Sequence, residues 1–131
     1  MALNPPPRAI ALAFAGGAAG TLVRALIGLS FETPVTLLIV NLLGTAFLGY
    51  INGSSGRERP RFHSAAAKWF WGAGFCGGFT TMSGLALAFV MFTANSGVIA
   101  SLVYVLLQLA AGLLAYALAF RIGRGAWPNV V

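Results

Sequence analysis

The chain has 131 residues, of which 59% are hydrophobic and 8% are charged, and its mean hydropathy is +0.87. Soluble domains carry about one quarter charged residues, so this composition excludes a water-soluble globular domain. The formal net charge is +6, but the chain offers no basic helix or soluble fold to present it, so nucleic acid is not expected as a partner. We therefore expect one integral membrane domain over residues 1–131.

Four apolar runs approach or exceed the roughly 20 residues that a helix needs to cross a bilayer. They are residues 9–29, 34–52, 65–92 and 97–120. The first run could instead be a cleaved signal peptide, with AFA at 13–15 as its cleavage site. The interpretation that we adopt is an all-α membrane protein with four transmembrane helices.

The basic residues are unevenly distributed between the two sides of this topology. With four spans, both termini and the loop between the second and third spans lie on one side. That side carries seven of the eight basic residues, and the other side has only Arg24, together with Glu32. Loops rich in Lys and Arg stay in the cytoplasm, so both termini are predicted to be cytoplasmic in a plasma-membrane protein that contacts lipid headgroups. The seven are Arg8, Arg57, Arg59, Arg61, Lys68, Arg121 and Arg124.

The third run contains GFCGGFTTMSG at residues 74–84, which is unusual for the middle of a membrane helix. Glycine weakens a helix, and hydroxyl groups in hydrocarbon need a partner. One interpretation is a continuous helix whose glycine face packs closely against a neighbour. The other is a broken helix, which is tolerated at membrane depth only where protein or a cavity satisfies the freed backbone.

Polar side chains also occur within the other runs. Arg24 is either an anchor that reaches toward the headgroups or a charge that attracts anions to a pore mouth. Asn41 either bonds a neighbouring helix or points its NH₂ group at an anion. Tyr104 and Gln108 are four residues apart and therefore share one helical face.

Groups for enzyme chemistry are scarce. Both carboxylates, Glu32 and Glu58, fall in loops, so no span carries an acid for proton coupling. The single histidine, His63, is in a loop without the partners that a metal site or a catalytic triad requires. We therefore expect that the protein is not an enzyme.

Three stretches carry a resemblance to a known family. They are GGAAGTLVRALIG at 16–28, TLLIVNLLGTAFLGY at 36–50 and GFCGGFTTMSG at 74–84. Through this ordered set the chain resembles the Fluc/CrcB family of fluoride channels over nearly its whole length. The resemblance implies passive export of F⁻ that relieves fluoride toxicity.

The family architecture is an antiparallel, dual-topology-type dimer with a broken third helix. The resemblance implies that the two breaks cross at the dimer centre and that backbone carbonyls there bind a structural Na⁺. The matching carbonyls are those of Gly77 and Thr80. It further implies a pore for F⁻ lined by Asn41, Arg24, Thr81, Ser83, Tyr104 and Gln108.

Several positions depart from the family pattern. Met82 and Leu85 occupy the positions of two pore aromatics, whose positive ring edges would face fluoride. Gln108 and Gly112 stand where the pattern has hydroxyl side chains. The residues that match are thus mainly those for the fold and the central ion.

The charge bias predicts which dimer forms. One sequence can insert in both orientations only when its Lys/Arg bias is small, and here it is seven to one. We therefore favour a fixed-topology subunit of a heterodimer with a homologous partner over a homodimer. Two other classes remain open: a small four-helix multidrug-type transporter, which would be expected to carry an intramembrane carboxylate, and a non-conducting structural subunit.

Overall fold

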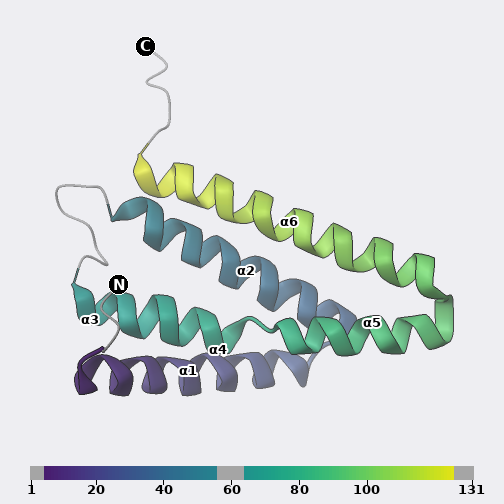
Figure 1. The fold of residues 1–131 in the computed structure, drawn as a ribbon, viewed down its shortest axis with the longest axis horizontal. Helices are drawn as coiled ribbons and strands as arrows, with labels where there is room; N and C mark the ends of the chain where they lie inside the picture. Colours follow the sequence, from purple (N-terminus) through teal and green to yellow (C-terminus); the bar gives the residue numbers. More distant parts are fainter. Residues whose placement is uncertain (1–4, 56–63, 126–131) are drawn as a thin grey trace, which may run out of the picture.

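The computed structural model describes residues 5–55 and 64–125, and every regular element in these ranges is helical. Four helical spans in this part of the chain are long and apolar enough to cross a membrane (Figure 1). The predicted fold class, an all-α membrane protein with four spans, is confirmed. The elements are α1 (Pro7–Gly28), α2 (Thr33–Ser54), α3 (Ala65–Ala67), η1 (Lys68–Cys76), α4 (Gly77–Phe79), α5 (Met82–Ser96) and α6 (Val98–Arg124).

Proline and glycine set several of the helix ends. Prolines lie in the first turn of α1 and of α2, where the missing N–H costs no helical hydrogen bond. Between α5 and α6 the chain reverses at Gly97, whose φ of 82° is a conformation that glycine adopts readily. This tight turn places α6 directly beside α5 (Figure 1).

Glycines allow the helices to pack backbone to backbone in two pairs. A Cβ on Gly16, Gly20 or Gly78 would collide with backbone atoms across the contact between α1 and the first half of the third span. The contact between α2 and α6 is equally close, since a Cβ on Gly49 or Gly53 would meet a carbonyl oxygen of α6. Small residues at such contacts are how membrane helices gain packing energy without a hydrophobic driving force.

The third span connects the two pairs because its two halves pack against different helices. Its first half, η1 and α4, packs along α1, whereas its second half, α5, packs against α6. The two halves are joined by the non-helical residues Thr80 and Thr81 (Figure 1). The prediction of a broken third helix is therefore confirmed, and the alternative of a continuous helix through 74–84 is wrong.

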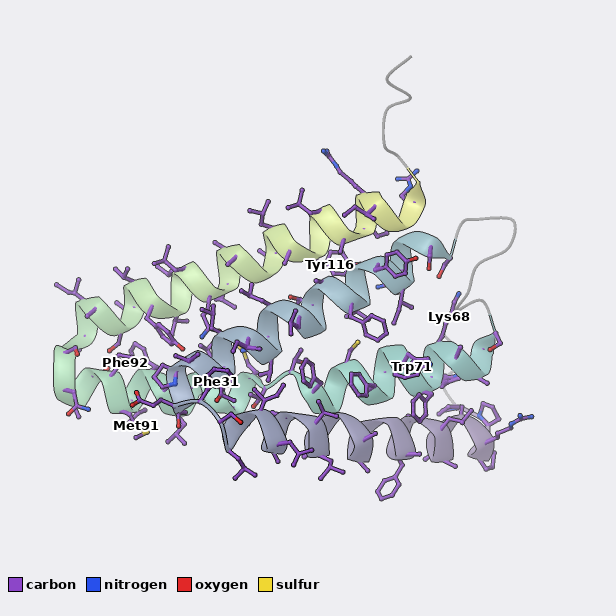
Figure 2. The ribbon with its side chains drawn as sticks, turned by 180° about the vertical axis from the view of Figure 1, so that it is seen from behind. Phe31, Lys68, Trp71, Met91, Phe92 and Tyr116 are labelled. Carbon is purple, nitrogen blue, oxygen red and sulfur yellow. The ribbon has the colours of Figure 1, made fainter. Side chains whose placement is uncertain are left out.

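The outer surface of the bundle is apolar. Side chains project outward along α1 and α6 (Figure 2). Leu113 is 72% exposed and Ile99 is 81% exposed. The fully buried side chains are few and are led by Ile51 and Val40. Such an apolar surface is suited to the hydrocarbon of a bilayer, and either lipid or a second subunit can cover it.

Most of the basic residues in the described ranges gather at one end of the bundle. Arg8 and the start of the third span line one shallow pocket, and the basic end of α6 packs beside the end of α2 at the same end (Figure 2). Glu32 precedes α2 at the opposite end, whereas Arg24 lies beside the break in the middle of the third span, where it contacts the Thr80 carbonyl. Three arginines of the predicted cytoplasmic side, together with Glu58 and His63, lie outside the described residues, and the orientation in the membrane stays a prediction. The three are Arg57, Arg59 and Arg61.

Candidate functional site

The break in the third span is built from two extended threonines. Thr80 has ψ of 159° and Thr81 has φ of −147° and ψ of 118°, so neither continues the helix. The Thr80 hydroxyl donates to the Cys76 carbonyl at 2.8 Å and closes the first half. The Thr81 hydroxyl accepts the Gly84 N–H at 3.0 Å and caps the start of α5, which is the usual role of a threonine N-cap.

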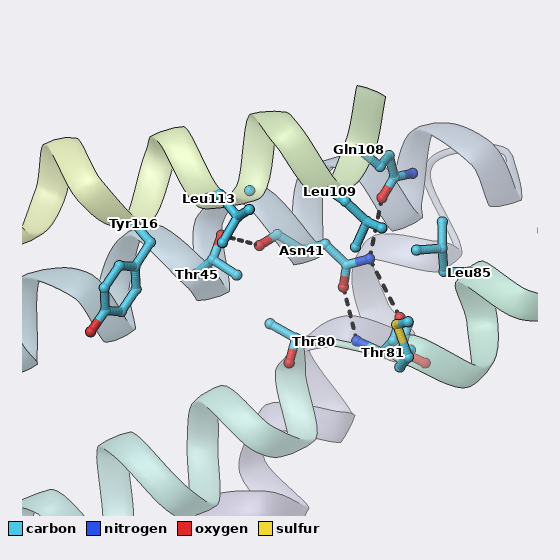
Figure 3. A pocket seen from close by; sticks show the side chains of 11 residues that line it. Asn41, Thr45, Thr80, Thr81, Leu85, Gln108, Leu109, Leu113 and Tyr116 are labelled. Carbon is cyan, nitrogen blue, oxygen red and sulfur yellow. Dashed lines mark hydrogen bonds between the residues drawn. The ribbon is translucent and has the colours of Figure 1, made fainter. Parts of the chain in front are cut away.

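Asn41 binds the backbone of the break from α2. Its Oδ1 accepts the Thr81 N–H at 2.9 Å, and its Nδ2 lies 3.4 Å from the Thr81 carbonyl oxygen (Figure 3). An unbroken helix would direct the Thr81 N–H to the Gly77 carbonyl, so the amide replaces the helical bond that the break removes. Asn41 thus belongs structurally to the break.

A chain of side-chain hydrogen bonds continues from Asn41 into α6. Asn41 Nδ2 donates to Gln108 Oε1 at 3.3 Å (Figure 3), and Gln108 Nε2 donates to the Tyr104 hydroxyl. The Tyr104 hydroxyl in turn donates to the Pro34 carbonyl at 3.1 Å. Tyr104 and Gln108 do share a face, as their spacing predicts, and that face meets Asn41.

Two side chains of α1 bind carbonyl groups at the end of the first half. Arg24 Nη1 lies 3.4 Å from the Thr80 oxygen, and the Thr21 hydroxyl donates to the Gly78 oxygen at 3.3 Å. The last carbonyls of a helix lack internal donors, and cationic side chains commonly fill that role. Arg24 is therefore bound to the break, an arrangement that neither of the two sequence interpretations described.

A pocket of about 300 Å³ opens beside this network between α2, α5 and α6 (Figure 3). Its polar end holds Asn41, Thr81 and Gln108, and apolar side chains form the rest. Of the two positions predicted for pore aromatics, Leu85 is 3% exposed while Met82 is 69% exposed. The complete lining is Asn41, Thr45, Thr80, Thr81, Met82, Leu85, Gln108, Leu109, Gly112, Leu113 and Tyr116.

The remaining predicted site residues lie around this pocket rather than in its lining. Ser83 is exposed, and its hydroxyl lies 3.2 Å from that of Thr81. Arg24 and Tyr104 reach the network through Thr80 and Gln108. Lining residues that sequence reasoning missed include Thr45 and Tyr116. Tyr116 follows Tyr104, Gln108 and Gly112 at a spacing of four, so that period could have indicated it.

The two carbonyls predicted to hold Na⁺ differ in their surroundings. The Gly77 carbonyl has lost its helical donor to Asn41, and a Cβ on Gly77 would meet nothing within 4 Å, so this residue faces open space. The Thr80 carbonyl already accepts from Arg24, although a carbonyl oxygen has a second lone pair. Both are oxygen ligands of the kind that hard cations prefer, and a site would need further oxygens from outside this chain.

Fold and pocket together define a class: a small polytopic membrane protein with a helix broken at membrane depth around a partly polar pocket. Residues 11–120 match the family model described as CrcB-like protein, Camphor Resistance (CrcB), and the chain belongs to that family. It is 36% identical over 111 residues to the fluoride-specific ion channel FluC 2 of Rhodococcus jostii, covering 82% of this chain and 91% of the relative.

Other relatives agree in name and in extent. FluC 1 of the same organism is 34% identical and covers 88% of both chains. FluC 2 of Bacillus subtilis is 34% identical, covering 85% of this chain and 84% of its own length. These names describe ion channels and not enzymes, in agreement with the sequence prediction.

Proposed function

We propose that this chain is a subunit of a fluoride-selective channel that exports F⁻ passively and relieves fluoride toxicity. Membership of the CrcB family carries the proposal. The relatives that this chain matches over most of their length are named fluoride-specific ion channels. The pocket agrees chemically. A small anion that leaves water needs hydrogen-bond donors, and amide and hydroxyl groups lie at the polar end of the pocket.

The proposed path for the anion follows the polar groups around the break. Arg24 attracts F⁻ toward the membrane, and Asn41 and Thr81 contact it beside the break. Ser83, Tyr104 and Gln108 supply further hydroxyl and amide groups along α5 and α6. Met82 and Leu85 offer no positive ring edge to the anion, so aromatic contacts in this pore would come from a partner subunit.

The partner that we propose is a homologous chain in antiparallel orientation. Seven of the eight basic residues fall on one side of the topology. This bias favours a single orientation in the plasma membrane, with both termini in the cytoplasm. An inverted copy of the same chain would then be rare. Rhodococcus jostii has two relatives of this chain, named FluC 1 and FluC 2, and paired homologous subunits accord with that.

A structural Na⁺ at the dimer centre is part of the same proposal. The Gly77 carbonyl loses its helical donor at the break, and Gly77 is an exposed residue. The Thr80 carbonyl lies three residues further on. Two such carbonyls from each subunit would give four oxygen ligands. When bound, the ion would neutralise carbonyl dipoles that otherwise face one another at the subunit contact.

Flux measurements distinguish the proposal from a transporter and from a structural subunit. The purified chain is reconstituted into liposomes, with and without a homologous partner, and F⁻ release is followed with and without an imposed pH gradient. A channel releases F⁻ at the same initial rate in both conditions once the membrane potential is clamped. Release that requires the pH gradient would indicate a proton-coupled transporter, and no release beyond that of the partner alone would indicate a structural subunit.

A further inference from the structure

The donor and the acceptor in each hydrogen bond around Gln108 are fixed by the backbone N–H of Thr81. The Thr81 N–H can only donate, so the Asn41 side chain must present Oδ1 to it, at 2.9 Å. Nδ2 of Asn41 then faces Gln108, and two NH₂ groups cannot bond each other. Gln108 must therefore turn Oε1 toward Asn41 and Nε2 toward Tyr104, as the structure has it.

This direction uses all the donors of Asn41. Its Nδ2 carries two hydrogens, and the two acceptors within reach are the Thr81 carbonyl at 3.4 Å and Gln108 Oε1 at 3.3 Å. An anion at the polar end of the pocket consequently finds no free hydrogen on Asn41. The Thr81 bond is internal to the break, so Gln108 is the partner that an anion has to replace.

Gln108 itself keeps one donor in reserve. Its Nε2 also has two hydrogens, and one of them bonds the Tyr104 hydroxyl. Among the residues that the structure describes, no hydrogen bond involves the second. Gln108 is 7% exposed and lines the pocket. It therefore competes with an anion in the pocket for the Nδ2 hydrogen of Asn41.

We propose that Gln108 controls anion access to Asn41 by occupying the second amide hydrogen of Asn41. This inference rests on the proposed function and specifies how the same pocket is controlled. A hydroxyl side chain at position 108 would be too short to hold Nδ2 in this way, so the departure from the family pattern at Gln108 has a defined consequence. Anion binding at Asn41 requires Gln108 to release Nδ2 first.

The test uses Gln108→Met, which preserves length and removes both polar atoms, and Gln108→Ser as a second variant. Leu107→Met is the matched control, because Leu107 is 64% exposed on the same helix and lies outside the pocket lining. The ¹⁵N-labelled full chain in detergent micelles is titrated with NaF and, at equal ionic strength, with NaCl. The Asn41 side-chain amide signals are assigned by their loss in Asn41→Asp.

Two results are expected. Gln108→Met moves the Asn41 amide signals before any fluoride is added, and NaF then shifts them at a concentration roughly two- to tenfold lower than in the wild type, the range for removing one competing neutral hydrogen bond. Equal fluoride response in wild type and both Gln108 variants, or none at Asn41 in any of them, would overturn the inference. Fluoride efflux by the wild type is measured separately, so its absence would contradict the proposed function and not this role of Gln108.

Discussion

Asn41 holds the break in the third span through the backbone of one residue, by accepting the Thr81 N–H and donating to the Thr81 carbonyl. At the membrane interior no water replaces a lost partner, so an unpaired backbone group there is costly. The amide is therefore expected to contribute to stability as well as to the pore. Its bond to Gln108 adds a contact between α2 and α6 at the same depth.

Replacing Asn41 by alanine should destabilise the protein by about 1–3 kcal/mol, the cost of an unsatisfied buried polar group. Thermal unfolding of the detergent-solubilised chain measures this. Thr45→Val is the matched control, because the Thr45 hydroxyl bonds only to carbonyls of its own helix. A loss in Asn41→Ala no larger than in the control would contradict the role of Asn41 at the break.

Thr81 and Ser83 are both hydroxyl residues of the predicted pore, but only one of them caps a helix. Thr81→Ala removes the acceptor for the Gly84 N–H and should cost about 1 kcal/mol of unfolding free energy, whereas Thr81→Ser restores it. Ser83→Ala removes only an exposed contact to Thr81 and should cost less. The same melting experiment compares the three, and equal losses for both alanine variants would be inconsistent with the cap.

At the scale of residues, sequence reasoning found the important side chains but not their partners. The polarity of Asn41 in an apolar run indicated that it bonds either a neighbouring helix or an anion, and the spacing of Tyr104 and Gln108 indicated a shared face. That they bond each other depends on α2 and α6 packing at one particular depth, which no local pattern specifies. The contact of Arg24 with the Thr80 carbonyl likewise depends on how α1 meets the break.

The third span is the element that carries both the fold and the candidate site. Gly78 and Gly77 are adjacent in it and face opposite environments. A Cβ on Gly78 would collide with the backbone of Gly17 in α1, and one on Gly77 would meet nothing within 4 Å. Substitutions at these two glycines therefore test two different contacts: Gly78 tests packing within the chain, and Gly77 tests contact with a partner.

Gly78→Ala should destabilise the folded chain, because the new methyl group meets the backbone of Gly17, which cannot move aside as a flexible side chain does. We expect a loss of about 1–3 kcal/mol in the free energy of unfolding. Gly77→Ala should leave the melting temperature of the solubilised single chain unchanged and weaken subunit association. Size-exclusion chromatography with light scattering reports the association. Unaltered assembly of Gly77→Ala would argue against a partner seated on the break.

Sequence patterns predicted the four spans and the position of the break, because hydropathy and glycine content are local properties. They did not predict that Lys68–Cys76 winds as a π-helix, nor that the third span continues to Ser96 before turning at Gly97. The wider winding accompanies the close approach of Gly16 and Gly20 to η1, a tertiary contact.

For the molecule as a whole, the bias of basic residues makes orientation testable. We expect a single orientation with both termini in the cytoplasm. Single cysteines are placed at residues 56–63, between α2 and the third span, in a Cys76→Ser background and labelled from either side of the membrane. Labelling from the cytoplasmic side alone is the expected result. Labelling from both sides, together with full fluoride resistance of cells that express only this chain, would contradict the heterodimer.

Sodium should stabilise the assembled protein and not the isolated chain, because the Gly77 and Thr80 carbonyls of one chain supply only part of a coordination shell. Melting temperatures of the assembly are compared in NaCl and in N-methyl-D-glucamine chloride at equal ionic strength. A higher value in sodium is expected for the assembly and no difference for the single chain. Equal values for the assembly in both salts would count against a bound Na⁺.

The central claim is that this chain forms part of a fluoride-selective channel, and ion-selective electrodes test it most directly. Liposomes containing the full chain and a homologous partner are loaded with equal concentrations of KF and KCl, and valinomycin is added to release the potential that limits passive efflux. The account predicts rapid release of F⁻ with Cl⁻ retained, and slower F⁻ release from liposomes that contain either chain alone. Equal release of the two anions, or F⁻ release no faster than from protein-free liposomes, would contradict it.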